Sequence, residues 1–114
     1  MKKAILAATL LGMSTAFIAC KKVKLEKDVP RCVEKKIRKI ANQKEGSSQA
    51  VWEWQTNGQR YYYFIGDCCD QFNYLYDDDC NQICAPDGGF SGGGDGKCPQ
   101  FGAIEKTLIW RDER

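Results

Sequence analysis

Seven cysteines are the feature that most constrains this chain of 114 residues. One of them, Cys20, follows an apolar N-terminal segment, and six lie beyond it: Cys32, Cys68, Cys69, Cys80, Cys84 and Cys98. A domain this small buries little more apolar surface than is needed to offset the entropy of its chain. Each disulfide adds about 2–4 kcal/mol to the free energy of unfolding. The six cysteines beyond Cys20 are an even number, which predicts a fold held by three disulfides.

The N-terminus has the layout of a bacterial secretory signal. Residues 1–3 form a short basic start, and residues 4–19 are uncharged, apolar and end in small residues. This run is shorter than the roughly 20 residues that a membrane-spanning helix needs. We therefore expect residues 1–19 to be a signal peptide that is removed from the mature protein.

The end of this segment, Phe17-Ile18-Ala19-Cys20, resembles the lipobox of bacterial lipoproteins, in which the cysteine receives the lipid. Ala19 and Cys20 fit that pattern, whereas Phe17 stands where Leu is usual. Cleavage after Ala16 is the alternative, and it would leave Cys20 as an odd thiol in an oxidising compartment. We expect lipidation at Cys20, a tether over residues 20–28, and a membrane-anchored protein of the cell envelope that faces the periplasm or the cell surface.

The pairing of the six remaining cysteines is underdetermined, because six cysteines allow fifteen connectivities. In an extended segment Cys68 and Cys69 point to opposite sides and should serve different partners. We expect the pairs Cys32–Cys68, Cys69–Cys84 and Cys80–Cys98. A thiolate metal site or a thioredoxin-like redox site would call for CxxC pairs, which the chain lacks.

A helix is expected after the tether. Asp28 or Val29 can cap it, Pro30 suits its first turn, and the segment Gly46-Ser47-Ser48 would end it. Apolar residues recur at helical spacing, at Val33, Ile37, Ile40 and Ala41. The sequence therefore predicts an amphipathic helix with one buried stripe.

Asn57-Gly58 lies between two β-prone runs, residues 50–55 and 60–65, and this is the strongest short-range signal for a hairpin. With these two residues as the turn, Trp54 stands opposite Tyr61 and Trp52 opposite Tyr63. We expect this four-aromatic face to pack against the helix. The other face would be mixed, with Val51, Glu53, Gln55, Arg60, Tyr62 and Phe64.

Three further runs have strand character: residues 72–76, 82–85 and 104–110. Together these elements predict an α+β fold in which one N-terminal helix packs on a four- or five-stranded antiparallel sheet stapled by disulfides. We expect this to be a single domain over residues 29–114.

The charges and the missing histidines exclude several functions. The chain has no His, which rules out His-based catalytic triads and His-ligated metals. After removal of residues 1–19, 15 basic residues balance 15 acidic ones, so a nucleic-acid partner is not expected. The basic residues gather near the N-terminus, where those beside Cys20 can sit over anionic head groups or form a solvated spacer.

Seven Asp residues fall between positions 67 and 95, a segment that is also rich in Gly. Carboxylates and exposed backbone carbonyls are calcium ligands, so Asp87 and Asp95 are candidate ligands for a calcium ion. The run Asp77-x-Asp79-x-Asn81 starts like an EF-hand loop but lacks the required Gly and Glu. The alternative is that Asp and Gly serve here as turn formers. No other cofactor is expected.

Several runs resemble one family of small, uncharacterised exported proteins and lipoproteins, mainly from bacteria of the Bacteroidetes type. They are Cys68 to Phe72, Leu75-Tyr76-Asp77, Cys80 to Gly89, Gly94 to Pro99 and the terminal Ile109 to Arg114. The resemblance covers about residues 30–114. Because the family is a domain of unknown function, it implies an envelope location and a compact disulfide-bonded domain, and it supplies no catalytic residues.

The leading hypothesis is a lipid-anchored, non-enzymatic module that binds a protein or a glycan of the envelope. The chain assembles no recognisable catalytic set. One alternative is a calcium-dependent module with the ion at the Asp- and Gly-rich loop. Another is a disulfide-rich inhibitor of an envelope hydrolase, with the Gly-rich loop inserted into its target.

Overall fold

The computed structural model describes residues 23–43, 50–66 and 70–113. The expected signal peptide, the expected lipidation site Cys20 and the neighbouring Cys68 and Cys69 lie outside these residues.

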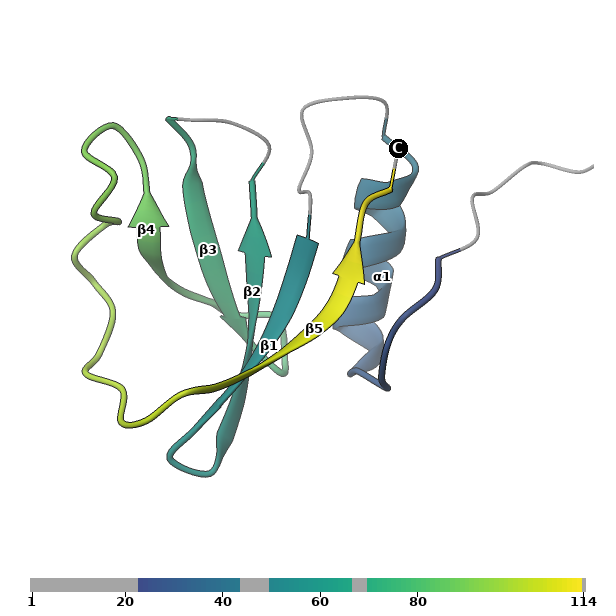
Figure 1. Ribbon diagram of the computed structural model, residues 1–114, viewed down its shortest axis with the longest axis horizontal. Helices are drawn as coiled ribbons and strands as arrows, with labels where there is room; N and C mark the ends of the chain where they lie inside the picture. The colour runs from purple at the N-terminus through teal and green to yellow at the C-terminus, as the bar shows by residue number, and fades with distance from the viewer. Residues whose placement is uncertain (1–22, 44–49, 67–69, 114) are drawn as a thin grey trace, which may run out of the picture.

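The described residues form one helix and five strands (Figure 1). They are α1 (Arg31–Ala41), β1 (Ala50–Thr56), β2 (Gln59–Ile65), β3 (Phe72–Asp77), β4 (Gln82–Gly88) and β5 (Glu105–Arg111). The strands form one sheet in the order β4-β3-β2-β1-β5, and every neighbouring pair is antiparallel. The expected α+β class is confirmed, with five strands.

Helix α1 is shorter than the sequence predicts. Pro30 is its N-cap, and its carbonyl oxygen accepts hydrogen bonds from the backbone N–H groups of Val33 and Glu34, both at 3.0 Å. At the other end the side-chain amide of Asn42 donates to the carbonyl of Arg38 at 2.9 Å. The backbone N–H of Asn42 donates to the same carbonyl at 3.2 Å. Asn42 thus caps the last turn, and the helix ends at Ala41 and not at Gly46.

The β1–β2 hairpin follows the prediction. Asn57 and Gly58 form the turn with φ of 51° and 76°, the left-handed values that a type I′ turn requires. Trp54 pairs with Tyr61, and Trp52 pairs with Tyr63.

The face that α1 covers is the opposite of the expected one. The core beneath the helix consists of Val33, Ile37, Ala41, Val51, Tyr62, Phe64, Ile109 and Trp110. The expectation that the Trp52 and Trp54 face would meet the helix is wrong, because residues from the long β4–β5 connection, including Phe101 and Ile104, pack there instead. The Phe101 ring lies edge-on to Trp54, with centroids 6.2 Å apart. Both faces of the hairpin therefore pack against other parts of the chain.

A bulge in β5 lets two consecutive residues enter the helix-side core. Val51 pairs with Trp110 while Trp52 pairs with Leu108, so Ile109 is the extra residue of β5. A bulge interrupts the alternation of side chains. Ile109 and Trp110 are both buried in the same cluster as a result.

Residues 23–28, expected to belong to a tether, pack against this core. Val23 and Leu25 contact it, and the backbone N–H of Glu26 donates to the carbonyl of Ile109 at 2.8 Å. Lys27 forms a 2.8 Å salt bridge with Glu53, a carboxylate that is only 1% exposed.

Two other groups face this buried carboxylate. The hydroxyl of Tyr62 donates to Glu53 at 3.2 Å, and the guanidinium of Arg60 lies 3.8 Å away. A buried charge is tolerated only with such partners. Glu53 thus fixes the N-terminal segment to the middle of β1.

Two disulfides join the described residues, and neither is an expected pair. Cys32 bonds to Cys80, with Cα atoms 6.2 Å apart, and Cys84 bonds to Cys98, with Cα atoms 5.0 Å apart. All three expected pairs are thereby wrong. The β3–β4 turn brings Cys80 to the first turn of α1, and Cys84 lies in the second core cluster together with Cys98.

We predict that the two disulfides contribute unequally to stability. Their sequence separations are 48 and 14 residues, and restriction of the unfolded chain grows with loop length. The double variant Cys32→Ser/Cys80→Ser should lose about 4 kcal/mol of unfolding free energy, and Cys84→Ser/Cys98→Ser about 3 kcal/mol. Urea unfolding measures both losses. An unchanged stability after removal of Cys32–Cys80 would contradict the prediction.

We also predict a loss of stability in alkali that depends on Tyr62. Burial, followed by the charge of Glu53, raises the pKa of Tyr62 from 10.0 to about 12. The unfolded chain releases this proton near pH 10 while the folded protein keeps it, so stability falls as the pH rises from 10 to 12. Urea unfolding across this range should give a shallower decline for Tyr62→Phe. Equal slopes for the variant and the wild type would contradict the assignment.

Candidate functional site

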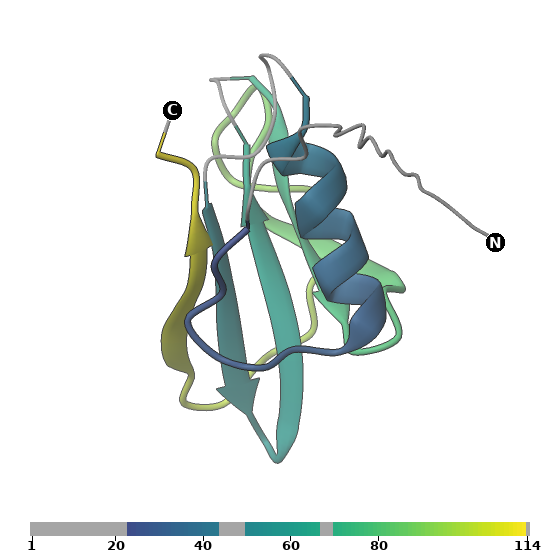
Figure 2. The same cartoon turned by 90° about the vertical axis from the view of Figure 1, so that its right-hand side faces the viewer.

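An aromatic groove runs between α1 and β3. It has a volume of about 510 Å³ and is lined by Lys36, Ile40, Gln43, Phe64, Gly66, Asp70, Gln71, Phe72, Tyr74 and Tyr76. Figure 2 shows α1 in front of one face of the sheet. Its side chains pack on β1, β2 and β5, and Lys36 reaches Tyr76 of β3, so the groove opens where β3 continues past the helix. The alternation of β3 places Phe72, Tyr74 and Tyr76 in a row on this face.

Each ring of the groove contacts the next one along β3. The centroids of Phe72 and Tyr74 are 5.7 Å apart, and those of Tyr74 and Tyr76 are 6.4 Å apart. The Lys36 ammonium lies 4.3 Å from the centroid of Tyr76 and covers that end of the row. Burial, then the neighbouring Tyr74, raises the pKa of Tyr76. The open part of the wall is therefore Tyr74 and Phe72, the latter 37% exposed.

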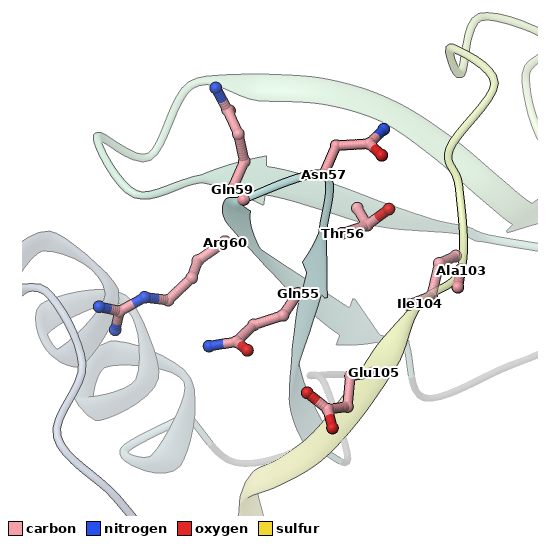
Figure 3. A pocket seen from close by; sticks show the side chains of 9 residues that line it. Gln55, Thr56, Asn57, Gln59, Arg60, Ala103, Ile104 and Glu105 are labelled. Carbon is pink, nitrogen blue, oxygen red and sulfur yellow. The ribbon is translucent and has the colours of Figure 1, made fainter.

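A second groove, of about 560 Å³, surrounds the β1–β2 turn. Figure 3 shows Gln55 and Arg60 pointing to one side and Thr56 turned toward Ala103 on the other. The hydroxyl of Thr56 is buried and has no hydrogen-bond partner among the described residues. This groove is polar and presents no aromatic side chain.

The loop after β4 presents one fully exposed ring. Phe90 is 95% exposed, and the glycines around it are held by backbone hydrogen bonds, from Gly92 to Gly89 at 3.1 Å and from Gly94 to Gly88 at 3.0 Å. A Cβ at Gly94, whose φ is +81°, would collide with the carbonyl of Ala85. The loop is therefore shaped by contacts that only glycine permits.

The two candidate calcium ligands serve the fold. The carboxylate of Asp87 accepts hydrogen bonds from the Tyr63 hydroxyl at 2.6 Å and from the Asn73 amide at 2.7 Å. Asp95 accepts from the backbone N–H of Lys97 at 3.0 Å, and this bond lowers the pKa of its carboxyl group. In the part of the chain that the structure describes, no three His, Cys, Asp or Glu residues are grouped to hold a metal ion.

The EF-hand-like run is a turn. One carboxylate oxygen of Asp77 accepts from the backbone N–H groups of Asp79 at 2.9 Å and Asn81 at 2.8 Å. Slight burial acts to raise the pKa of Asp77, but the hydrogen bonds from Asn81 and Asp79 outweigh it and lower that pKa. This is the turn-forming alternative that the sequence left open.

Sequence reasoning found the strand that carries the aromatic groove but missed the groove itself. Residues 72–76 are predicted to form a strand, yet nothing in that run says how far the helix extends over the sheet. Among the residues that the structure describes, no helix is long and apolar enough to cross a membrane.

These features define a small disulfide-bonded α+β domain with an aromatic surface groove. The chain belongs to the family of the domain of unknown function DUF6970, whose model matches residues 38–112, more than half of its length. No curated protein and no solved structure matches the chain.

We predict that calcium does not stabilise the domain, since Asp87 already has protein partners. The melting temperature should be the same in chelator and in millimolar calcium. Asp87→Ala should lower the unfolding free energy by about 1–3 kcal/mol in both conditions, because it leaves the partly buried donors of Tyr63 and Asn73 unpaired. A calcium-dependent rise in melting temperature that Asp87→Ala or Asp95→Ala abolishes would contradict this prediction.

Proposed function

We propose that this protein is a lipid-anchored, non-enzymatic binding module of the cell envelope, and that the aromatic groove binds a saccharide chain. The observation that carries the proposal is the row formed by Phe72, Tyr74 and Tyr76, of which the helix leaves two rings open. Lipidation at Cys20 is part of the proposal and rests on the lipobox-like sequence and on the even number of the other cysteines.

The chemistry of the groove suits a sugar. A sugar ring has an apolar face of C–H groups, which can stack on an aromatic side chain, and a polar edge of hydroxyl groups. The Tyr74 and Phe72 rings supply the apolar surface. The exposed amide of Gln71 and the exposed carboxylate of Asp70 lie along the same groove and can pair with hydroxyls. A few polar groups beside an apolar wall is the usual composition of a ligand site.

Among the described residues, the groups with shifted pKa values are consistent with a binding role. Acid–base catalysts have pKa values shifted toward the working pH. The resolved shifts run the other way: the pKa values of Tyr62, Tyr63 and Tyr76 are raised, and those of Asp77 and Asp95 are lowered. Each of these groups thus keeps its ordinary protonation state at neutral pH.

The test is a titration of the isotope-labelled mature protein with defined oligosaccharides of the envelope, followed by NMR. We expect amide shifts clustered at β3 and α1, and we expect Tyr74→Ala to weaken binding at least tenfold. Trp52→Ala is unsuitable as a control because Trp52 packs in the second core cluster. The matched control is Gln55→Ala, which alters the polar groove of Figure 3.

Three results would overturn parts of the proposal. Amide shifts confined to the polar groove would show that the sugar binds there and not in the aromatic groove. Binding of an envelope polypeptide, with no response to sugars, would show that the ligand is not a saccharide. An unmodified Cys20 in the mass spectrum of membrane-extracted protein would remove the anchor.

A further inference from the structure

The packed N-terminal segment leaves little free chain between the domain and the proposed lipid. Val23 already contacts the helix-side core, and Glu26 is hydrogen-bonded to Ile109 of β5. Only three residue steps separate Cys20 from Val23. Fully extended, they span about 11 Å. A lipid on Cys20 must therefore hold the domain close to the bilayer surface.

The direction of this segment decides which end of the domain is held. Lys27 lies at Glu53, in the middle of β1, and Glu26 lies at Ile109, beside the start of that strand. The chain leading back to Val23 therefore runs toward Ala50, the first residue of β1. We call this the anchor end of the sheet (the upper end in Figure 1).

The register of the sheet brings other residues to the same end. Ala50 pairs with both Ile65 and Arg111, and Phe72 pairs with Gly88, so the loop that carries Phe90 leaves the sheet there. Phe72 and Phe90 are the exposed large hydrophobic residues in the described part of the chain. Figure 1 shows the loop after β4 at the same height as the end of α1.

The far end of the sheet has the opposite character. It carries the hairpin turn Asn57-Gly58 and the β3–β4 turn, whose Asp78 and Asp79 are exposed. Carboxylates are repelled by the anionic head groups of a membrane. At the anchor end the exposed charges are mixed, with Lys39 and Arg111 beside Asp70 and Glu113, so charge alone would not orient the domain.

We propose that the anchor end faces the bilayer and that Phe90 inserts into its interfacial region as a second point of attachment. An exposed ring on a loop already shaped by backbone hydrogen bonds can be buried with little loss of chain entropy. Exposed apolar groups of this kind mark protein or membrane contacts, and membrane attachment is firm when two signals combine. Because a lipid on Cys20 would hold this end of the domain close to the bilayer, a membrane contact is favoured over a protein contact. This inference rests on the lipidation of the proposed function.

The test uses the mature protein in nanodiscs that contain a paramagnetic lipid, with NMR intensities of backbone amides as the readout. We expect the amides of residues 88–93 to lose more than half of their intensity and those of residues 57–59 and 78–79 to keep theirs. Phe90→Gln should restore the loop signals, and it should fold normally because Phe90 makes no core contact. The control Gln59→Phe puts an exposed ring at the far end, where the short connection should keep it away from lipid.

The same chain with a diacyl group coupled chemically to residue 20 separates the two claims. If cellular protein proves unmodified but the coupled chain gives the expected pattern, the anchor of the proposed function fails and the membrane-facing end stands. If the coupled chain shows equal attenuation at both ends, or none at residues 88–93, the membrane proposal is overturned. In the latter case Phe90 is left open to a protein partner.

Discussion

The disulfide between Cys32 and Cys80 is the constraint on which the arrangement of this domain depends. It joins the first turn of α1 to the β3–β4 turn, and therefore sets where the only described helix lies on the sheet. The buried stripe of α1 has only three residues, Val33, Ile37 and Ala41. So few apolar side chains offset little of the chain entropy that is lost on folding. With the helix held there, it covers β1, β2, β5 and Tyr76 of β3 but leaves Tyr74 and Phe72 open, and the aromatic groove follows from that position.

The second disulfide and the buried carboxylate of Glu53 each hold another segment of the chain against the sheet. Cys84–Cys98 holds the β4–β5 connection on the far face of the sheet, where Phe101 and Ile104 cover Trp54. Glu53 draws the N-terminal segment onto β1 through Lys27. The two constraints leave a short link toward the membrane at one end and a shaped, Gly-rich loop at that same end. The proposed roles in sugar binding and membrane contact both derive from this geometry.

Local signals in the sequence predict the helix and the strands but do not predict which of them contact one another. Asn57-Gly58 determined the hairpin and its register, because positive φ at two consecutive positions is a local requirement. Which face meets the helix is not a local property: the aromatic face is covered by a distant connection, whose Phe101 lies 47 residues after Trp54 in the chain. Cysteine pairing failed for the same reason, and Glu53 gave no sign of being buried because its partner Lys27 looked like part of a free tether.

The most direct test of this account is a disulfide map of the native protein, from proteolysis without reduction followed by mass spectrometry. The account predicts one peptide pair that links Cys32 to Cys80 and another that links Cys84 to Cys98. A link from Cys32 to Cys68 would contradict the placement of the helix. Free thiols at all four positions, in protein that still unfolds cooperatively, would contradict the claim that disulfides stabilise this small domain.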